Sequence, residues 1–153
     1  MDIALRYDPE ARAYDLALEA GDLAADETLQ TAVLLSLYTD RRAHPSDALP
    51  DGSTDRRGCW SDAYSARPAG SRLWLIDREK ELGTVLRRAR EYGEESLAWI
   101  VEDGIADDVE VDAQHLRRGV LQLLVTIRRG EESVLEQQYD YVWSALNGGF
   151  NGV

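Results

Sequence analysis

Two clusters of charged residues in the first half of the chain carry side chains suited to recognising another protein. One cluster is Asp40, Arg41 and Arg42, and the other is Asp55, Arg56 and Arg57, with Trp60 close behind. Arginine forks form bidentate hydrogen bonds with carboxylates, and arginine and tryptophan are enriched in protein interfaces. Two interpretations stay open. The arginines and Trp60 form a patch that binds a partner, or Arg41 or Arg56 pairs with an acid of its own domain and holds the segment in place.

Both clusters lie in residues 39–70, where proline and glycine recur and no helix or strand periodicity is present. Irregular segments of this length inside a domain are usually functional or disordered. Trp60 and Tyr64 give this segment aromatic side chains that can pack, which favours an ordered, functional loop. We therefore expect a partner-binding site here, with Trp60 as its aromatic anchor.

Other residue types do not form a recognisable catalytic or metal site. The possible nitrogen and sulfur ligands are His44, His115 and Cys59, and their spacing is not that of a zinc site. We expect no metal, no cofactor and no enzymatic activity. An acid pair for glycoside hydrolysis could be drawn from one helical stretch, but such residues usually form the solvated face of an amphipathic helix. These residues are Glu94, Glu95, Glu102 and Asp103.

Composition narrows the class of partner. The chain has 153 residues, with 29 acidic and 17 basic side chains, and a net charge of −12. Residues 41–70, with five basic and four acidic side chains, are the only part that is not acidic. A chain this acidic repels phosphate backbones, so we expect no nucleic-acid partner. No apolar run is long enough to cross a membrane, and the N-terminus is not a signal peptide, which predicts synthesis in the cytoplasm.

Alternating apolar residues predict two N-terminal strands, residues 2–7 and 14–19, joined as a hairpin by a turn at Asp8-Pro9-Glu10. Asp26 is placed to cap a first helix that ends near Tyr38 or Thr39. A second helical pattern begins near Ser71, with Gly93 as a possible break or kink, and ends before Gly104. Three further stretches predict β-structure: residues 109–111, Val120–Ile127 and Leu135–Trp143.

This order of elements predicts one α+β domain, residues 1–146, followed by a flexible glycine-rich tail, residues 147–153. Two main helices would pack on a largely antiparallel sheet, built from the N-terminal hairpin and the C-terminal strands. Strand edges can accept a strand from another chain. We expect the sheet of Val120–Ile127 with Leu135–Trp143 to offer such an edge, and we count Tyr139 and Tyr141 among the partner-binding residues.

Several motifs in order resemble those of the Mu-like phage and prophage baseplate proteins, which are small tail proteins related to wedge and sheath-initiator subunits. They are DIAL, GDLAADETLQTAVLLSLYTDRRA, DRRGCW, GSRLWLIDREK and EESLAWIVEDGIA. The resemblance runs from about residue 2 to the region of Trp143. One departure is Cys59, where the family pattern leads us to expect an aromatic residue ahead of Trp60.

The resemblance implies a structural subunit of a contractile tail baseplate, present in several copies around a ring in the virion. Its expected partners are baseplate wedge proteins and the tail sheath protein, and its expected role is to join wedge subunits and initiate sheath assembly. Because distant relatives have carried a lysozyme label, a tail-associated peptidoglycan hydrolase is the alternative. A third interpretation is an acidic adaptor of a host cell with no phage context.

Overall fold

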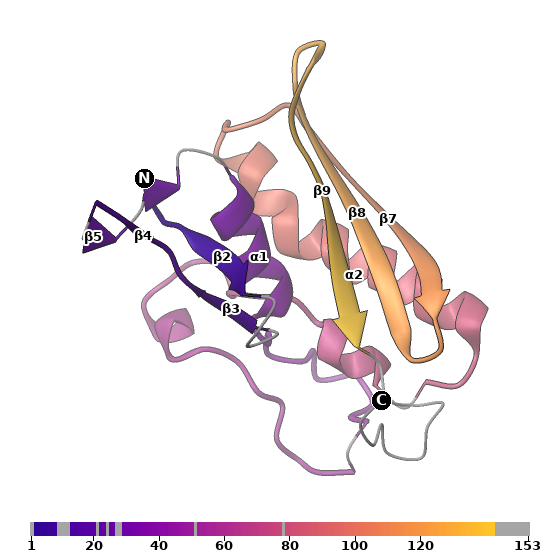
Figure 1. Ribbon diagram of the computed structural model, residues 1–153. Coiled ribbons are helices and arrows are strands. Elements are labelled where there is room, and N and C mark those ends of the chain that lie inside the picture. Colours follow the sequence, from indigo (N-terminus) through magenta and orange to yellow (C-terminus); the bar gives the residue numbers. More distant parts are fainter. Residues whose placement is uncertain are drawn as a thin grey trace.

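The computed structural model describes residues 2–8, 13–20, 22–23, 25–26, 29–50, 52–77 and 79–142, and it confirms the α+β class. A three-stranded sheet lies against a long helix, α2 (Leu82–Glu102), and a shorter helix, α1 (Gln30–Tyr38), lies between this sheet and the N-terminal strands (Figure 1). The predicted turn around Pro9, the glycine-rich tail and the position of Trp143 lie outside the described residues.

The N-terminal strands form short antiparallel pairs. The predicted hairpin is confirmed as β2 (Leu5–Asp8) with β3 (Ala13–Leu16). Two further pairs were not predicted: β4 (Leu18–Glu19) with β5 (Asp22–Leu23), and β1 (Asp2–Ile3) with β6 (Ala25–Asp26). In the described part of the chain, each pair is a two-stranded sheet separate from the C-terminal strands, whereas we had expected one shared sheet.

The first helix, α1 (Gln30–Tyr38), ends where predicted but begins later. The predicted cap at Asp26 is wrong, because the helix begins only at Gln30 with Leu29 as its N-cap, and Asp26 instead pairs with Asp2 in β6 and β1. The expected apolar face is correct: Val33 and Leu37 are almost completely buried, and Leu29 packs against the same core.

The second helix, α2 (Leu82–Glu102), also begins later than predicted. Residues 73–76 form a short 3-10 helix, η2 (Leu73–Ile76), whose four side chains are all buried. Four consecutive buried residues do not fit the single apolar stripe of an amphipathic α-helix, which explains why the helical pattern could not start at Ser71. Gly104, with φ of +71°, follows the end of α2 in the left-handed conformation that was expected there.

Gly93 neither breaks nor kinks α2, which runs through it without interruption. Its function is to let the helix approach the sheet closely. A Cβ atom at this position would lie 2.9 Å from Cγ1 of Val111, a buried residue of the neighbouring strand. The glycine therefore lowers the helix propensity of α2, but it allows α2 to pack more closely on the sheet.

Replacing Gly93 with alanine should destabilise the protein by about 1 kcal/mol, measured by urea unfolding. The gain in helix propensity is about 1 kcal/mol, but overpacking against Val111 costs about 1–3 kcal/mol. In a Val111→Ala background the clash is absent, so the same Gly93→Ala change should stabilise by up to about 1 kcal/mol. An equal effect of Gly93→Ala in both backgrounds would show that the contact with Val111 is not the reason for the glycine.

The C-terminal sheet contains β7 (Asp108–Arg117), β8 (Val120–Arg129) and β9 (Glu132–Val142), all antiparallel in the order β7-β8-β9. Because β8 is paired on both sides, the edge that we expected from the sheet of Val120–Ile127 with Leu135–Trp143 belongs to β9 and not to β8. The edges of this sheet are β7 and β9. The turn between β8 and β9 projects beyond the helices (Figure 1).

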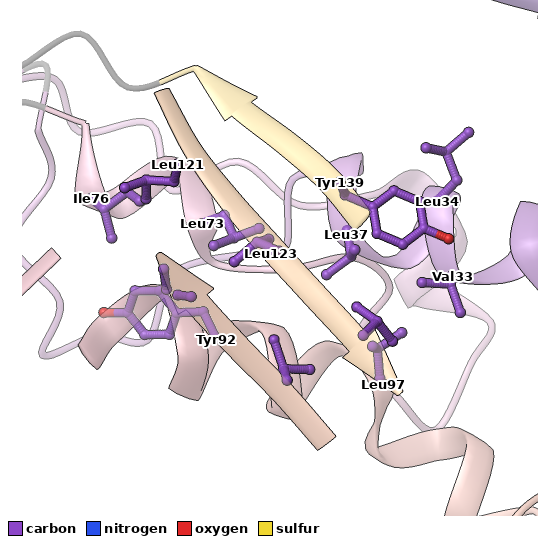
Figure 2. Close-up of a cluster of buried hydrophobic side chains, with 14 of the residues drawn as sticks. Val33, Leu34, Leu37, Leu73, Ile76, Tyr92, Leu97, Leu121, Leu123 and Tyr139 are labelled. Carbon is purple, nitrogen blue, oxygen red and sulfur yellow. The ribbon is translucent and has the colours of Figure 1, made fainter. Parts of the chain in front are cut away.

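The hydrophobic core lies between this sheet and the two helices (Figure 2). The predicted inner face of β8 is confirmed, since Leu121, Leu123, Val125 and Ile127 are each no more than 1% exposed. These side chains meet residues of α1, η2 and α2, which are Val33, Leu37, Leu73, Ile76, Tyr92 and Leu97. The central strand β8 thus supplies the surface on which α1, η2 and α2 pack.

Candidate partner-binding site

The irregular segment between the helices is fixed at both ends to the C-terminus of α1. We call residues 39–71 the anchored loop. The backbone N–H of Ser71 donates to the carbonyl of Thr39 at 2.8 Å, and the N–H of Arg41 donates to the carbonyl of Ser71 at 2.9 Å. The buried Ser71 hydroxyl donates to the carbonyl of Leu37 at 2.5 Å. Gly70, with φ of +89°, makes this close approach possible.

The two ends of the anchored loop are also attached to α2, through Glu95. Arg41 pairs with this carboxylate at 3.2 Å, and Arg72 pairs with its other oxygen at 2.9 Å. Arg72 also pairs with Asp47 at 2.9 Å, and its guanidinium lies 4.7 Å from the ring centre of Tyr92. Burial lowers the pKa of Arg72, but the hydrogen bonds to Glu95 and Asp47 outweigh this and raise it. Arg72 therefore carries a positive charge at any physiological pH.

The remaining predicted arginines also bind within the chain. Arg56 donates to the carbonyls of His44 and Asp47, at 2.6 and 3.3 Å. Arg57 pairs with Asp40 at 2.7 Å and lies 4.4 Å from the ring centre of Trp74, while Arg42 donates to the carbonyl of Arg57 at 3.5 Å. Of the two interpretations left open by the sequence, the internal one describes Arg41, which pairs with an acid of its own domain, whereas Arg56 is held by backbone carbonyls.

Asp62 organises the tip of the anchored loop. Its carboxylate accepts hydrogen bonds from the N–H of Cys59 at 3.2 Å and from the N–H of Ala69 at 2.9 Å. Arg67 pairs with Glu102 and Asp103 at the end of α2, at 3.1 and 2.9 Å, and these bonds raise its pKa. The tip is therefore held both by its own backbone and by α2.

Two aromatic side chains project from this fixed tip. Trp60 is the first residue of the short helix η1 (Trp60–Ala63) and Tyr64 follows its last residue; their side chains are 82% and 86% exposed. Their ring centres are 6.4 Å apart in an edge-to-face arrangement. Nearby in sequence, Ser65 and Arg67 line a hollow of about 530 Å³ that Leu35 and Trp99 also line. We call Trp60 and Tyr64 the aromatic pair.

The two predicted tyrosines of β9 lie elsewhere. Tyr139 is 2% exposed and points into the core, because it shares the inner face of the sheet with Leu123 opposite it, so its assignment to a partner-binding surface is corrected. Tyr141 is half-buried and stacks on Tyr38 of α1, with ring centres 6.3 Å apart. Burial raises the pKa of both Tyr38 and Tyr141. The β9 tyrosines thus join α1 to the sheet.

Sequence reasoning missed several of the charged residues that fix the anchored loop. We interpreted Glu95 as part of a solvated helix face, and we assigned no function to Asp47, Asp62 or Arg72. Partners of these residues lie up to 54 positions away, as in the pairing of Arg41 with Glu95, so no local spacing could reveal them. The one available signal was the excess of arginine in an otherwise acidic chain.

Within the described residues, no three or more His, Cys, Asp or Glu side chains are grouped closely enough to hold a metal ion. In the same part of the chain, no helix combines the length and apolar character that a membrane span requires.

Comparison with known proteins shows which family shares this sequence. The sequence model of a family described as "Phage protein GP46" matches residues 29–134, well over half of the chain. The chain belongs to this family. The match extends from the start of α1 through the anchored loop and α2 into β9, so the GP46 family region includes the whole of the candidate site.

Two curated relatives confirm the resemblance to Mu-like baseplate proteins. Over 134 residues the chain is 45% identical to "Baseplate protein gp46" of Escherichia phage Mu, covering 88% of this chain and 90% of the relative. Over 131 residues it is 32% identical to "Mu-like prophage FluMu protein gp46" of Haemophilus influenzae, covering 85% and 90%. The GP46 relatives are thus matched over nearly their whole length.

Proposed function

We propose that this chain is a non-enzymatic structural subunit of a contractile phage tail baseplate, where it joins wedge proteins and initiates assembly of the tail sheath. The observation that carries the proposal is the 45% identity, over 90% of its length, to the baseplate protein of phage Mu. In this proposal several copies occupy a ring in the virion tail, after synthesis in the bacterial cytoplasm, and no nucleic acid is bound.

The anchored loop supports a wedge-binding role. Aromatic side chains that are exposed on a rigid base are typical interface anchors, because little conformational entropy is lost when a partner covers them. The aromatic pair meets this description, since Asp62, Arg67 and Glu95 hold its base. In the proposal, Arg41, Arg42, Arg56 and Arg57 act mainly by presenting this pair, and their exposed parts form the polar rim.

Replacing Trp60 and Tyr64 with serine should abolish wedge assembly without unfolding the protein. Neither side chain is buried, so we expect a change in unfolding free energy of no more than about 0.5 kcal/mol. Loss of two aromatic anchors should weaken wedge binding by at least about 100-fold, measured by co-purification or calorimetry with the wedge proteins. Ala63→Ser, an exposed change between them, is the control. Normal wedge assembly by the double variant would refute this role.

The hydrolase alternative makes a separate prediction. Glu102, one of its four nominal catalytic residues, accepts a hydrogen bond from Arg67 at 3.1 Å and so contributes to loop attachment. A turbidity assay on purified cell walls distinguishes the two functions, with Glu94→Gln and Glu102→Gln as controls. The structural proposal expects no clearing by the wild type. Clearing that both variants abolish would replace it with the hydrolase function.

A further inference from the structure

Sheath initiation by strand addition requires an edge, and the C-terminal sheet has two. In the described part of the chain, β7 and β9 each pair with β8 on one side only. Because the two edges carry different side chains and contacts, they can be compared directly.

The outward backbone groups of β9 can be assigned from one hydrogen bond. The Tyr38 hydroxyl donates to the carbonyl of Asp140, so this carbonyl points away from β8. In an antiparallel pair the N–H and C=O of one residue point the same way, and the direction alternates along the strand. Gln138 and Glu136 therefore also point their backbone groups outward, while Leu135, Gln137 and Tyr139 face β8.

Both ends of this outward edge are interrupted. Ile127 pairs with Leu135 and Arg128 pairs with Ser133, so Val134 is an extra residue that forms a bulge and interrupts regular pairing. At the other end Tyr38 occupies the carbonyl of Asp140, and its ring stacks on Tyr141. The segment Leu135–Tyr139 lies between these two stops.

Charged side chains along the β7 edge disfavour pairing with a strand of another chain. Asp108, Glu110 and Asp112 alternate along it on the face away from α2. Arg90 of α2 pairs with Asp112 at 2.8 Å, and to reach that face its side chain must cross the β7 edge. Charged side chains along an edge are a common protection against unwanted strand pairing. Between the two stops on β9, by contrast, Glu136 is the only charged residue.

We propose that a partner strand adds to β9 over Leu135–Tyr139, and that Tyr38 sets the position at which this pairing ends. The inference rests on the proposed function, of which it specifies the sheath-binding site. The occupant is an extended segment of a partner protein in which basic and apolar side chains alternate. Its basic side chains lie beside Glu136 and Asp140 on the outer face, and its apolar ones lie beside Leu135 and Tyr139 on the inner face.

Amide hydrogen exchange on the full chain tests the edge directly. The probe is an acetylated ten-residue peptide of alternating valine and lysine, and a peptide with the same residues in two blocks is the control. The alternating peptide should slow exchange at the outward amides of Glu136 and Gln138 by at least tenfold.

The β7 edge is the internal control for this measurement. By the same alternation the outward amides of β7 belong to Val109, Val111 and Ala113, and the exchange rates of these amides should not change. Protection of the β7 amides, or of neither edge, would overturn the proposal, as would equal binding of the block peptide.

Two proline variants of equal charge give an independent test. Gln138→Pro removes an outward N–H of β9 and should weaken binding of the alternating peptide at least tenfold, measured by fluorescence anisotropy. Val109→Pro makes the corresponding change on β7 and should alter binding by less than twofold. Tyr38→Phe frees the carbonyl of Asp140, lengthens the accepting segment and should tighten binding about threefold. If circular dichroism shows that a proline variant does not fold, the exchange measurement on the wild type decides.

An assay of tail assembly distinguishes an error in the β9-edge inference from an error in the proposed function. Wild-type chain absent from purified tails would contradict the proposed function itself. Wild-type chain present in tails, together with normal sheath assembly by the folded Gln138→Pro variant, would contradict the β9 edge alone.

Discussion

Replacement of Gly70 with alanine should destabilise the protein by about 3–4 kcal/mol. A Cβ atom there would lie 2.2 Å from the carbonyl oxygen of Thr39, which is backbone and cannot move aside cheaply. The left-handed backbone adds a further cost of about 1–2 kcal/mol for a residue with a side chain. Moving Thr39 also breaks its bond with Ser71 and disturbs that of Arg41, at about 1 kcal/mol each. Urea unfolding measures the total.

The matched control for this effect is Gly52→Ala. Gly52 also has a positive φ, +69°, but a Cβ atom there meets nothing within 4 Å. This variant should therefore lose only the conformational part, about 1–2 kcal/mol. If both variants lose the same stability, the close approach of residue 70 to Thr39 makes no contribution, and the attachment of the loop to α1 must be reconsidered.

Glu95→Gln should loosen the anchored loop and destabilise the protein by about 2 kcal/mol. The change removes the charge that binds both Arg41 and Arg72, whose side chains are 15% and 23% exposed. Exposed ion pairs contribute about 0–1 kcal/mol, whereas breaking a buried pair costs about 3–5 kcal/mol, and this partly buried pair of contacts lies between those limits. Amide exchange at Arg41 and Ser71 should become at least tenfold faster.

The neighbouring residue provides the control, because Glu94→Gln changes the net charge by the same amount on an exposed side chain. It should cost no more than about 0.5 kcal/mol and leave loop exchange unchanged. Equal effects of the two variants would mean that the overall charge of α2, rather than the specific attachment through Glu95, holds the loop. Wedge binding by Glu95→Gln should fall as well, since the aromatic pair loses its rigid base.

The elements of the fold that could be predicted from the sequence are those with strong periodicity. The inner face of β8, the apolar face of α1 and the end of α2 at Gly104 all follow from spacing and local backbone chemistry. Strand order did not follow, because alternation shows that a strand has two faces but not which strands flank it. For this reason the sequence could not show that β8, the most regular strand, lies in the middle of the sheet and that β9 forms one of its edges.

The candidate site was predicted in part. Its location in residues 39–70 and its aromatic anchor follow from composition, and Trp60 is indeed exposed at the tip of the anchored loop. The contacts of the arginines could not be predicted, since Arg41 and Arg72 meet Glu95 only after α2 packs beside the loop. Tyr139 was misassigned because its burial depends on α1 covering the inner face of β9.

The central position of β8 determines when the core can form during synthesis. Both helices and the loop leave the ribosome before residues 120–129, yet their apolar faces pack on that strand. Until it emerges, Val33, Leu37, Leu97 and the buried residues of η2 lack part of the surface that covers them in the folded protein. Exposed apolar surface of this kind makes nascent chains prone to aggregation. Folding of this protein is therefore expected to be a late event that is completed only when translation has passed the central strand.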